Sequence, residues 1–75
     1  TVARREQLLR FARLTPRERE VLLHVLRGRL NKQIAADLGI DERSVKRHRS
    51  GLMAKLEVRS VAQLSRLAVE AGYPT

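Results

Sequence analysis

The sequence predicts an all-α fold, a four-helix bundle built around a central helix-turn-helix. Its 75 residues suffice for one small domain. Apolar residues recur at intervals of three and four along most of the chain, which is the period of an amphipathic helix. No segment alternates polar and apolar residues for long enough to predict a strand, and cap residues divide the chain into separate helices.

The first helix of the bundle is expected to begin at Thr15. Thr15, Pro16 and Glu18 have the order of an N-cap, a first helical residue and the acid of a capping box. The apolar residues of its inner face are Val21, Leu22, Val25 and Leu26. Gly28 ends this helix, because glycine readily takes the backbone conformation that follows a helix.

The second predicted helix begins at Asn31, its expected N-cap. The apolar residues of its inner face are Ile34, Ala35 and Leu38. Gly39 closes the helix, and Ile40 is the expected buried residue of the turn that follows.

The third predicted helix runs from its N-cap, Asp41, to about Leu56. Ala35 lets the second and third helices cross closely, Gly39 supplies the turn, and Val45 packs the third helix back against the second. The spacing of these small, glycine and apolar residues is typical of a helix-turn-helix.

A fourth helix is predicted from Ser60, which forms a capping box with Gln63, to Gly72. Residues 73–75 form a C-terminal tail. For residues 1–14, which hold no Gly or Pro, both a linker helix from a missing upstream domain and a frayed terminus remain open. The helix-turn-helix domain is therefore expected at residues 15–72.

Charge favours a nucleic acid as the partner, with an anionic membrane surface second. Sixteen Lys and Arg against eight Asp and Glu give a net charge of +8, and 13 of the sixteen are arginine. Arginine binds phosphates and guanine edges with two parallel hydrogen bonds. No apolar stretch approaches the roughly 20 residues of a membrane span. Phe11 and Tyr73 are the only aromatic residues, which excludes a base-stacking platform for single strands.

Enzyme and metal chemistry have no support in the sequence. The chain has no cysteine, and His24 and His48 alone cannot close a zinc site. The serines have no base partner for nucleophilic catalysis. We therefore expect no enzyme, no cofactor and no metal site. His48 is expected to pack or to contact phosphate, and His24 to be a partly exposed residue without a special task.

The third predicted helix has an apolar and a basic face. Its inner face carries Val45, Leu52 and Leu56. The opposite face carries Arg43, Lys46, Arg47, Ser50 and Ala54. Such a basic stripe fits the major groove, with an ordinary solvated face as the simple alternative. A basic helical adaptor for an acidic protein is a further alternative, which the scarcity of aromatic anchors disfavours. Arg49 lies towards the core side and is interpreted as the ion-pair partner of Glu18 or Glu20.

The fourth predicted helix carries two apolar stripes. The core-facing stripe consists of Leu64, Leu67, Ala68 and Ala71. Val61, Ser65 and Val69 lie near or beyond its edge and are the candidate contact between two copies, to which residues 8–12 could add. Because one recognition helix covers only a few base pairs, specific binding is expected to need two copies on two half-sites.

Three motifs, in order, resemble the LuxR-type helix-turn-helix family. Residues 14–22 (LTPREREVL) are similar to its opening helix, and residues 31–40 (NKQIAADLGI) to its scaffold helix and turn. Residues 44–50 (SVKRHRS) and 53–56 (MAKL) resemble its recognition helix. The resemblance covers about residues 14–72, and the AGYP tail at residues 71–74 is most like the FixJ-like branch of response regulators.

The resemblance implies a bacterial transcription factor that binds double-stranded DNA with residues 41–56 in the major groove. Its missing N-terminal part would be a phosphorylatable receiver domain. The implied partners are DNA, a second copy of the chain, the receiver domain and RNA polymerase, and the implied location is the cytoplasm, at the nucleoid, with no membrane partner. A LuxR-type regulator whose upstream domain senses a small signal molecule is the alternative.

Carried over by position, the family's base-reading residues fall on Lys46, Arg47 and Ser50. Its phosphate contacts fall on Asn31, Lys32, Arg43, Ser44, His48 and Lys55. Arg47, Ser50 and Gly51 depart from the common pattern of the family, which leaves the preferred DNA sequence open. Gly51 should also weaken its helix by about 0.5–1 kcal/mol relative to alanine.

Overall fold

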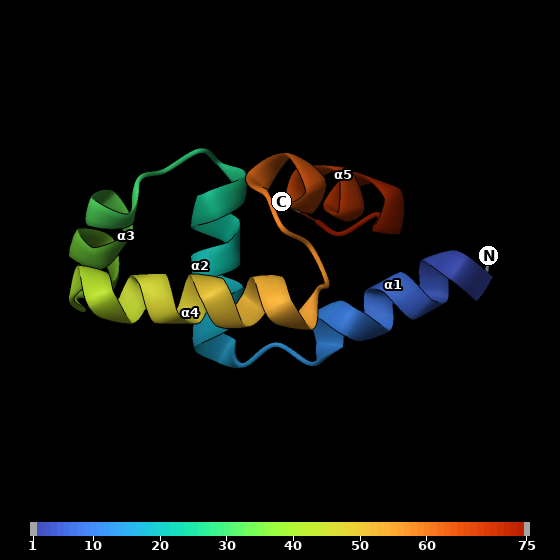
Figure 1. The fold of residues 1–75 in the computed structure, drawn as a ribbon, viewed down its shortest axis with the longest axis horizontal. Coiled ribbons are helices and arrows are strands. Elements are labelled where there is room, and N and C mark those ends of the chain that lie inside the picture. Colours follow the sequence, from blue (N-terminus) through green and yellow to red (C-terminus); the bar gives the residue numbers. More distant parts are fainter. Residues whose placement is uncertain (1, 75) are drawn as a thin grey trace.

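The computed structural model describes residues 2–74 as five α-helices, with no strand among them (Figure 1). The helices are α1 (Val2–Ala12), α2 (Pro16–Leu26), α3 (Asn31–Leu38), α4 (Glu42–Lys55) and α5 (Val61–Ala71). The all-α prediction with a central helix-turn-helix, α3 and α4, is confirmed. Thr1 of the expected linker helix and Thr75 of the expected tail lie outside the described residues.

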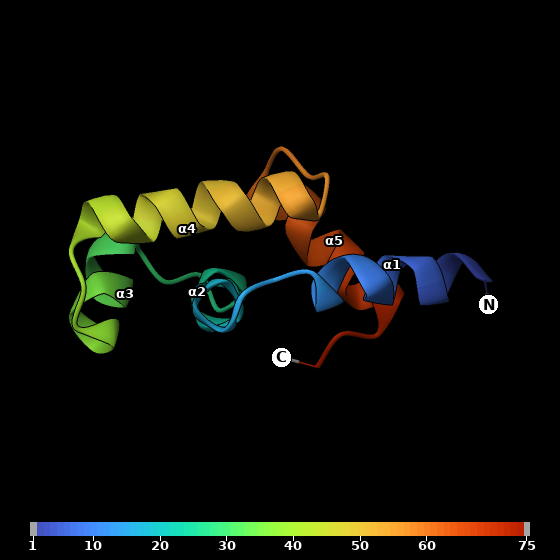
Figure 2. The ribbon, with the colours of Figure 1, turned by 90° about the horizontal axis from the view of Figure 1, so that it is seen from below.

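The longest helix, α4, lies across α2 and reaches from one end of the molecule towards the other. Figures 1 and 2 show α3 at one end and α1 beside α5 at the other, and the described residues extend over 38 × 20 × 20 Å. α2 contacts both α4 and α5, so it joins the two ends. One core runs through all five helices, and its buried apolar residues are Phe11, Leu14, Val21, Leu22, Val25, Ile34, Ala35, Val45, Leu52, Leu56, Leu64, Leu67, Ala68 and Ala71. Ile40 is half-buried rather than buried, because its turn lies at the end of the molecule (Figure 1).

Local capping follows the sequence closely. The capping box of α2 is present: Glu18 N–H donates to Thr15 Oγ1 at 3.1 Å, and Thr15 N–H donates to Glu18 Oε1 at 2.9 Å. Gly39 has a φ of 67°, the left-handed conformation that the turn between α3 and α4 requires. Asp41 caps α4, and Gly72 ends α5 as predicted.

One N-cap prediction is wrong by one residue, and one capping box lacks its expected second bond. The N-cap of α3 is Leu30, not Asn31, because Gln33 Oε1 reaches back and accepts the Leu30 N–H at 2.9 Å. In α5, Ser60 accepts the Gln63 N–H as expected, but Gln63 Oε1 accepts from Arg59 N–H at 2.7 Å instead of from Ser60. In both cases a glutamine side chain replaces or extends the expected cap.

Residues 2–12 form the helix α1, so the frayed-terminus alternative is wrong for this segment. α1 packs beside α5, and the ring of Phe11 stacks on that of Tyr73 with their centroids 4.3 Å apart. Arg10 also pairs with Glu57 at 3.1 Å. Because Phe11 is only 2% exposed, it is closed to the contact between copies expected for residues 8–12, whereas Leu8 and Leu9 remain exposed.

An ion pair between the buried carboxylate of Glu18 and the half-buried Lys55 joins α2 to α4. Glu18, 6% exposed, receives a hydrogen bond of 2.6 Å from Lys55 Nζ while it also caps α2. Burial raises the pKa of Glu18, but the hydrogen bonds from Lys55 and Thr15 outweigh it and hold the pKa below its usual range. The expected pairing of Arg49 with Glu18 or Glu20 is wrong: Lys55 binds Glu18, and Arg17 pairs with Glu20 at 3.0 Å.

We expect Lys55→Met to lower the free energy of unfolding by about 1.5–3 kcal/mol at neutral pH, because it leaves a buried carboxylate without its cation. The folded-state pKa of Glu18 is depressed, so the contribution of the pair is present above the unfolded pKa of about 4.3 and is lost as the pH falls through the folded pKa. The stability difference between variant and parent should therefore shrink below about pH 4, as measured by urea unfolding across pH. Lys32→Met, at an exposed lysine, is the matched control, and a difference that stays constant with pH would contradict the assignment.

Candidate nucleic-acid interface

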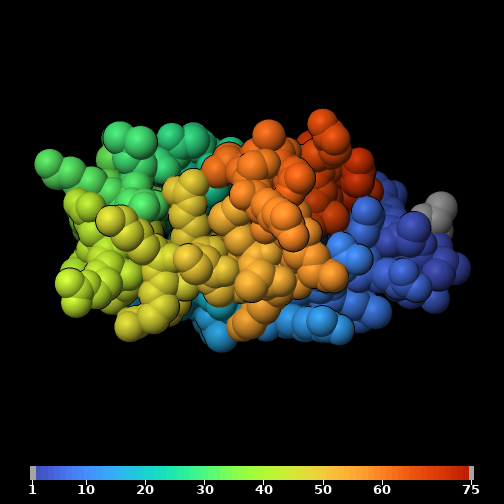
Figure 3. All heavy atoms as spheres, viewed as in Figure 1, coloured from blue at the N-terminus to red at the C-terminus, as the bar shows by residue number. Residues whose placement is uncertain are grey.

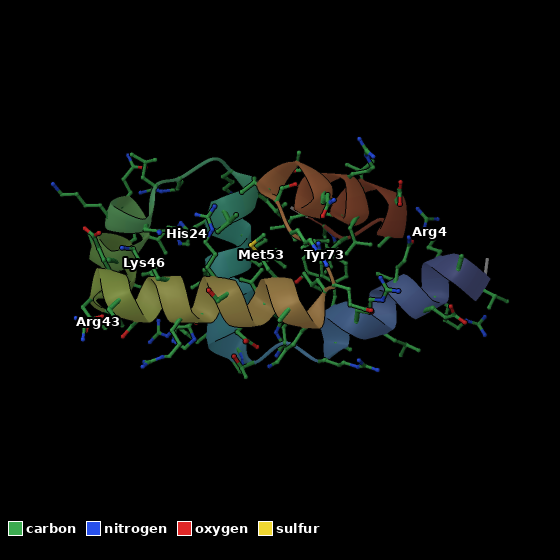
Figure 4. The ribbon with its side chains drawn as sticks, viewed as in Figure 1. Arg4, His24, Arg43, Lys46, Met53 and Tyr73 are labelled. Atoms are coloured by element: carbon green, nitrogen blue, oxygen red, sulfur yellow. The ribbon has the colours of Figure 1, made fainter. Side chains whose placement is uncertain are left out.

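The exposed side of α4 is basic. Burial of Val45, Leu52 and Leu56 fixes the rotation of the helix about its axis. This turns the predicted opposite face outward, and the exposed residues there are Arg43, Lys46, Arg47, Ser50 and Ala54. Figure 3 shows α4 forming the middle of one face of the molecule, and Figure 4 shows Arg43 and Lys46 at its α3 end. The inside-outside assignment of this helix is confirmed.

The start of α4 is held by its own cap. Ser44 N–H donates to Asp41 Oδ1 at 2.6 Å, and Arg47 Nη2 lies 3.5 Å from Ser44 Oγ. The hydrogen bonds from Ser44 lower the pKa of Asp41 below its usual range. The three base-reading candidates, Lys46, Arg47 and Ser50, thus follow a first helical turn that the Asp41 cap holds in place.

The predicted phosphate contacts fall into an exposed group and a half-buried group. Arg43 and Lys32 are exposed, whereas Ser44, His48 and Asn31 are half-buried. Lys55 is set apart from both groups, because its ammonium is 2.6 Å from Glu18 Oε1. Its contact with phosphate stays a prediction, as do the other phosphate and base contacts.

Arg49 connects the two helices of the helix-turn-helix. Its Nη1 donates to Asn31 Oδ1, the side-chain oxygen of the first residue of α3, at 3.0 Å. This partner was missed from the sequence because the helical wheel gives the direction of Arg49 but not which element lies there.

A polar cluster between α2 and α3 was also missed. Asp37 Oδ2 lies 2.6 Å from Arg29 Nη2 and 4.0 Å from His24 Nδ1. The His24 side chain is 19% exposed, so it is partly exposed as expected. The cluster connects α3 to α2 and to the loop between them.

Residues 12–68 match the family model described as bacterial regulatory proteins of the luxR family. The chain belongs to this family. Among its relatives, it is 44% identical over 64 residues to the transcriptional regulatory protein FixJ of Rhizobium meliloti, covering 85% of the chain and 31% of FixJ. It is 43% identical over 65 residues to the tetrathionate response regulatory protein TtrR of Salmonella typhimurium, covering 87% and 32%.

Solved structures support the assignment of the chain to the luxR family. It resembles full-length FixJ from B. japonicum with a TM-score of 0.89 and 34% identity, covering 99% of the chain and 36% of FixJ. It resembles the response regulator StyR with a TM-score of 0.88 and 46% identity, covering 91% and 34%. The chain therefore spans about a third of the length of these relatives.

The comparisons confirm the predicted resemblance to FixJ-like response regulators. The chain that carries the basic face of α4 thus belongs to a family of bacterial regulatory proteins. Within residues 2–74, no helix is both long and apolar enough to cross a membrane.

Gly51 lies where α4 passes the buried carboxylate of Glu18. A Cβ atom at this position would lie 2.6 Å from Glu18 Oε2. We expect Gly51→Ala to destabilise the chain by about 1 kcal/mol, because the overlap outweighs the gain in helix propensity. In a Glu18→Ala background the same substitution should stabilise it by about 0.5–1 kcal/mol. Thermal and urea unfolding of the four chains measure both effects, and equal effects in the two backgrounds would refute the steric explanation.

Proposed function

We propose that this chain is the sequence-specific DNA-binding output domain of a bacterial response-regulator transcription factor. The observation that carries the proposal is the exposed basic face of α4, in which Lys46, Arg47 and Ser50 lie on one side of a helix with a fixed core-facing side. Residues 41–56 would lie in the major groove as the recognition helix, where these three side chains reach base edges.

Phosphate contacts would come from both flanks of the groove. Arg43, Ser44 and His48 on α4 and Asn31 and Lys32 at the start of α3 are in position to supply them. Such contacts provide most of the affinity and its salt dependence, while the base contacts provide the specificity.

The remainder of the protein is proposed from its relatives. FixJ and TtrR are named as regulatory proteins, and each is about three times the length that the chain matches. This supports an upstream receiver domain whose phosphorylation state controls the output domain, with RNA polymerase as a further partner at the nucleoid in the cytoplasm. An upstream domain that senses a small signal molecule has less support, since the relatives cited above include response regulators.

A second copy of the chain is proposed to bind through α5. Val69 is 79% exposed, while Val61 and Ser65 are half-buried beside it. Ser65 and Val69 line a hollow of about 150 Å³ together with Leu26, Ala68 and Tyr73. An exposed apolar side chain beside an apolar hollow suits a small contact that forms mainly on DNA.

The division between base and phosphate contacts is tested with a duplex selected from a random pool and a scrambled duplex. Lys46→Ala and Arg47→Ala should each weaken binding to the selected duplex by about 1–3 kcal/mol and relax the preference at one or two base pairs. Lys32→Ala should weaken binding to both duplexes equally and reduce the salt dependence. Failure of the parent chain to prefer any sequence would refute the proposed function, and identical behaviour of the three variants would refute the roles.

We expect Val69→Lys to leave the melting temperature and binding to a single half-site unchanged but to abolish cooperative binding to two half-sites. The reason is that it places a charge in the contact between copies while its own site is open to solvent. Sedimentation with both duplexes measures the stoichiometry. Val2→Lys, at a side chain that is 71% exposed on α1, is the matched control. Full cooperativity of Val69→Lys would rule out the α5 contact.

A further inference from the structure

A notch beside the recognition helix is lined by arginine and asparagine. It has a volume of about 310 Å³ and lies between the end of α2, the start of α3, α4 and the start of α5. Its polar lining consists of Arg29, Asn31 and Arg49, and its apolar walls of Val25, Leu30 and Val61. Asp37 pairs with Arg29, so the positive charge of the notch comes from Arg49.

The hydrogen bonds around the notch leave donors available. Arg49 Nη1 donates to Asn31 Oδ1 at 3.0 Å, which fixes the side-chain amide and leaves both N–H bonds of Asn31 Nδ2 for another acceptor. Arg29 Nη2 binds Asp37, whereas Arg29 Nε is buried and has no hydrogen-bond partner among the described residues. The first backbone N–H groups of α3, which starts at Asn31, add further donors.

The notch meets α4 at Arg49, the residue before the base-reading candidate Ser50. Figures 1 and 3 show the loop between α2 and α3 and the start of α5 on the same side of α4. Lys32, next to Asn31, is exposed. A helix in the major groove has a phosphate backbone along each of its two sides, so a backbone phosphate is expected near the notch.

We propose that the notch binds one backbone phosphate of DNA, with Arg49 as the residue that organises it. Arg49 orients the amide of Asn31 and supplies the charge that the phosphate neutralises. The inference rests on the proposed DNA binding and adds a residue with no assigned DNA contact. A guanidinium suits this double task because its donors lie in a rigid plane and can bind two acceptors at once.

The test measures the affinity of the chain for a scrambled duplex as a function of salt, so that no base contact is needed. Arg49→Gln should lower the affinity about tenfold at about 0.1 M salt and reduce the slope of log affinity against log salt by about 0.9, the value for one phosphate. Arg49→Lys should restore the slope, because it keeps the charge, but only part of the affinity. Arg5→Gln changes the net charge equally on α1, at the end of the molecule opposite α3, and should leave the slope nearly unchanged (Figure 1).

Circular dichroism of each variant separates loss of folding from loss of contact, because a smaller folded fraction lowers the apparent affinity without changing the slope. A parental slope in Arg49→Gln, or an equal loss of slope in Arg5→Gln, would overturn the phosphate site while leaving DNA binding intact. A parent chain that binds no duplex of any sequence would overturn the proposed function, and the phosphate site with it.

Discussion

The crossing of α4 over α2 is the constraint on which the rest of the structure depends. Val45, Leu52 and Leu56 are fully buried along α4 and at its C-cap, and truncating one of these side chains would cost about 2–5 kcal/mol because a packed core relaxes only partly. Once these three side chains are inside, the basic residues of α4 must face outward. The outer surface of the helix is therefore determined by its inner surface, and substitutions on the exposed side can change the proposed DNA contacts without changing the fold.

Polar contacts then determine the register between the helices, which apolar packing alone leaves adjustable. Glu18 is one carboxylate with two tasks: it caps α2 and accepts the hydrogen bond from Lys55 on α4. Gly51 provides the space for that carboxylate, so a residue with poor helix propensity stands inside α4 for a steric reason. At the other end, Arg49 joins α4 to α3. Because the buried carboxylate of Glu18 is costly without its partner, the Glu18–Lys55 pair favours one register between α2 and α4 over its neighbours.

The features that the sequence predicted are those determined within a few residues. The cap at Thr15, the turn at Gly39 and the inner face of α4 each depend on near neighbours along the chain. The partners of Arg49 and Phe11 depend on which helix lies opposite, and no spacing along one helix encodes that. One signal in the sequence was not used. Val21, Leu22 and Val25 follow Glu18 at positions i+3, i+4 and i+7, so Glu18 lies on the same buried face of the helix. That spacing predicts a buried acid in need of a cation from another helix.

The distribution of ion pairs also explains how a strongly basic chain directs its charge. The carboxylates of Glu18, Glu20, Asp37 and Glu57 pair with cations that hold helices or loops in place: Lys55, Arg17, Arg29 and Arg10. In the described part of the chain, none of these pairs involves the cations on the outer face of α4. The acids thus neutralise structural cations and leave the outer face of α4 positive. A polyanion approaching this face displaces no internal partner of Arg43 or Lys46, so its binding does not weaken the fold that presents them.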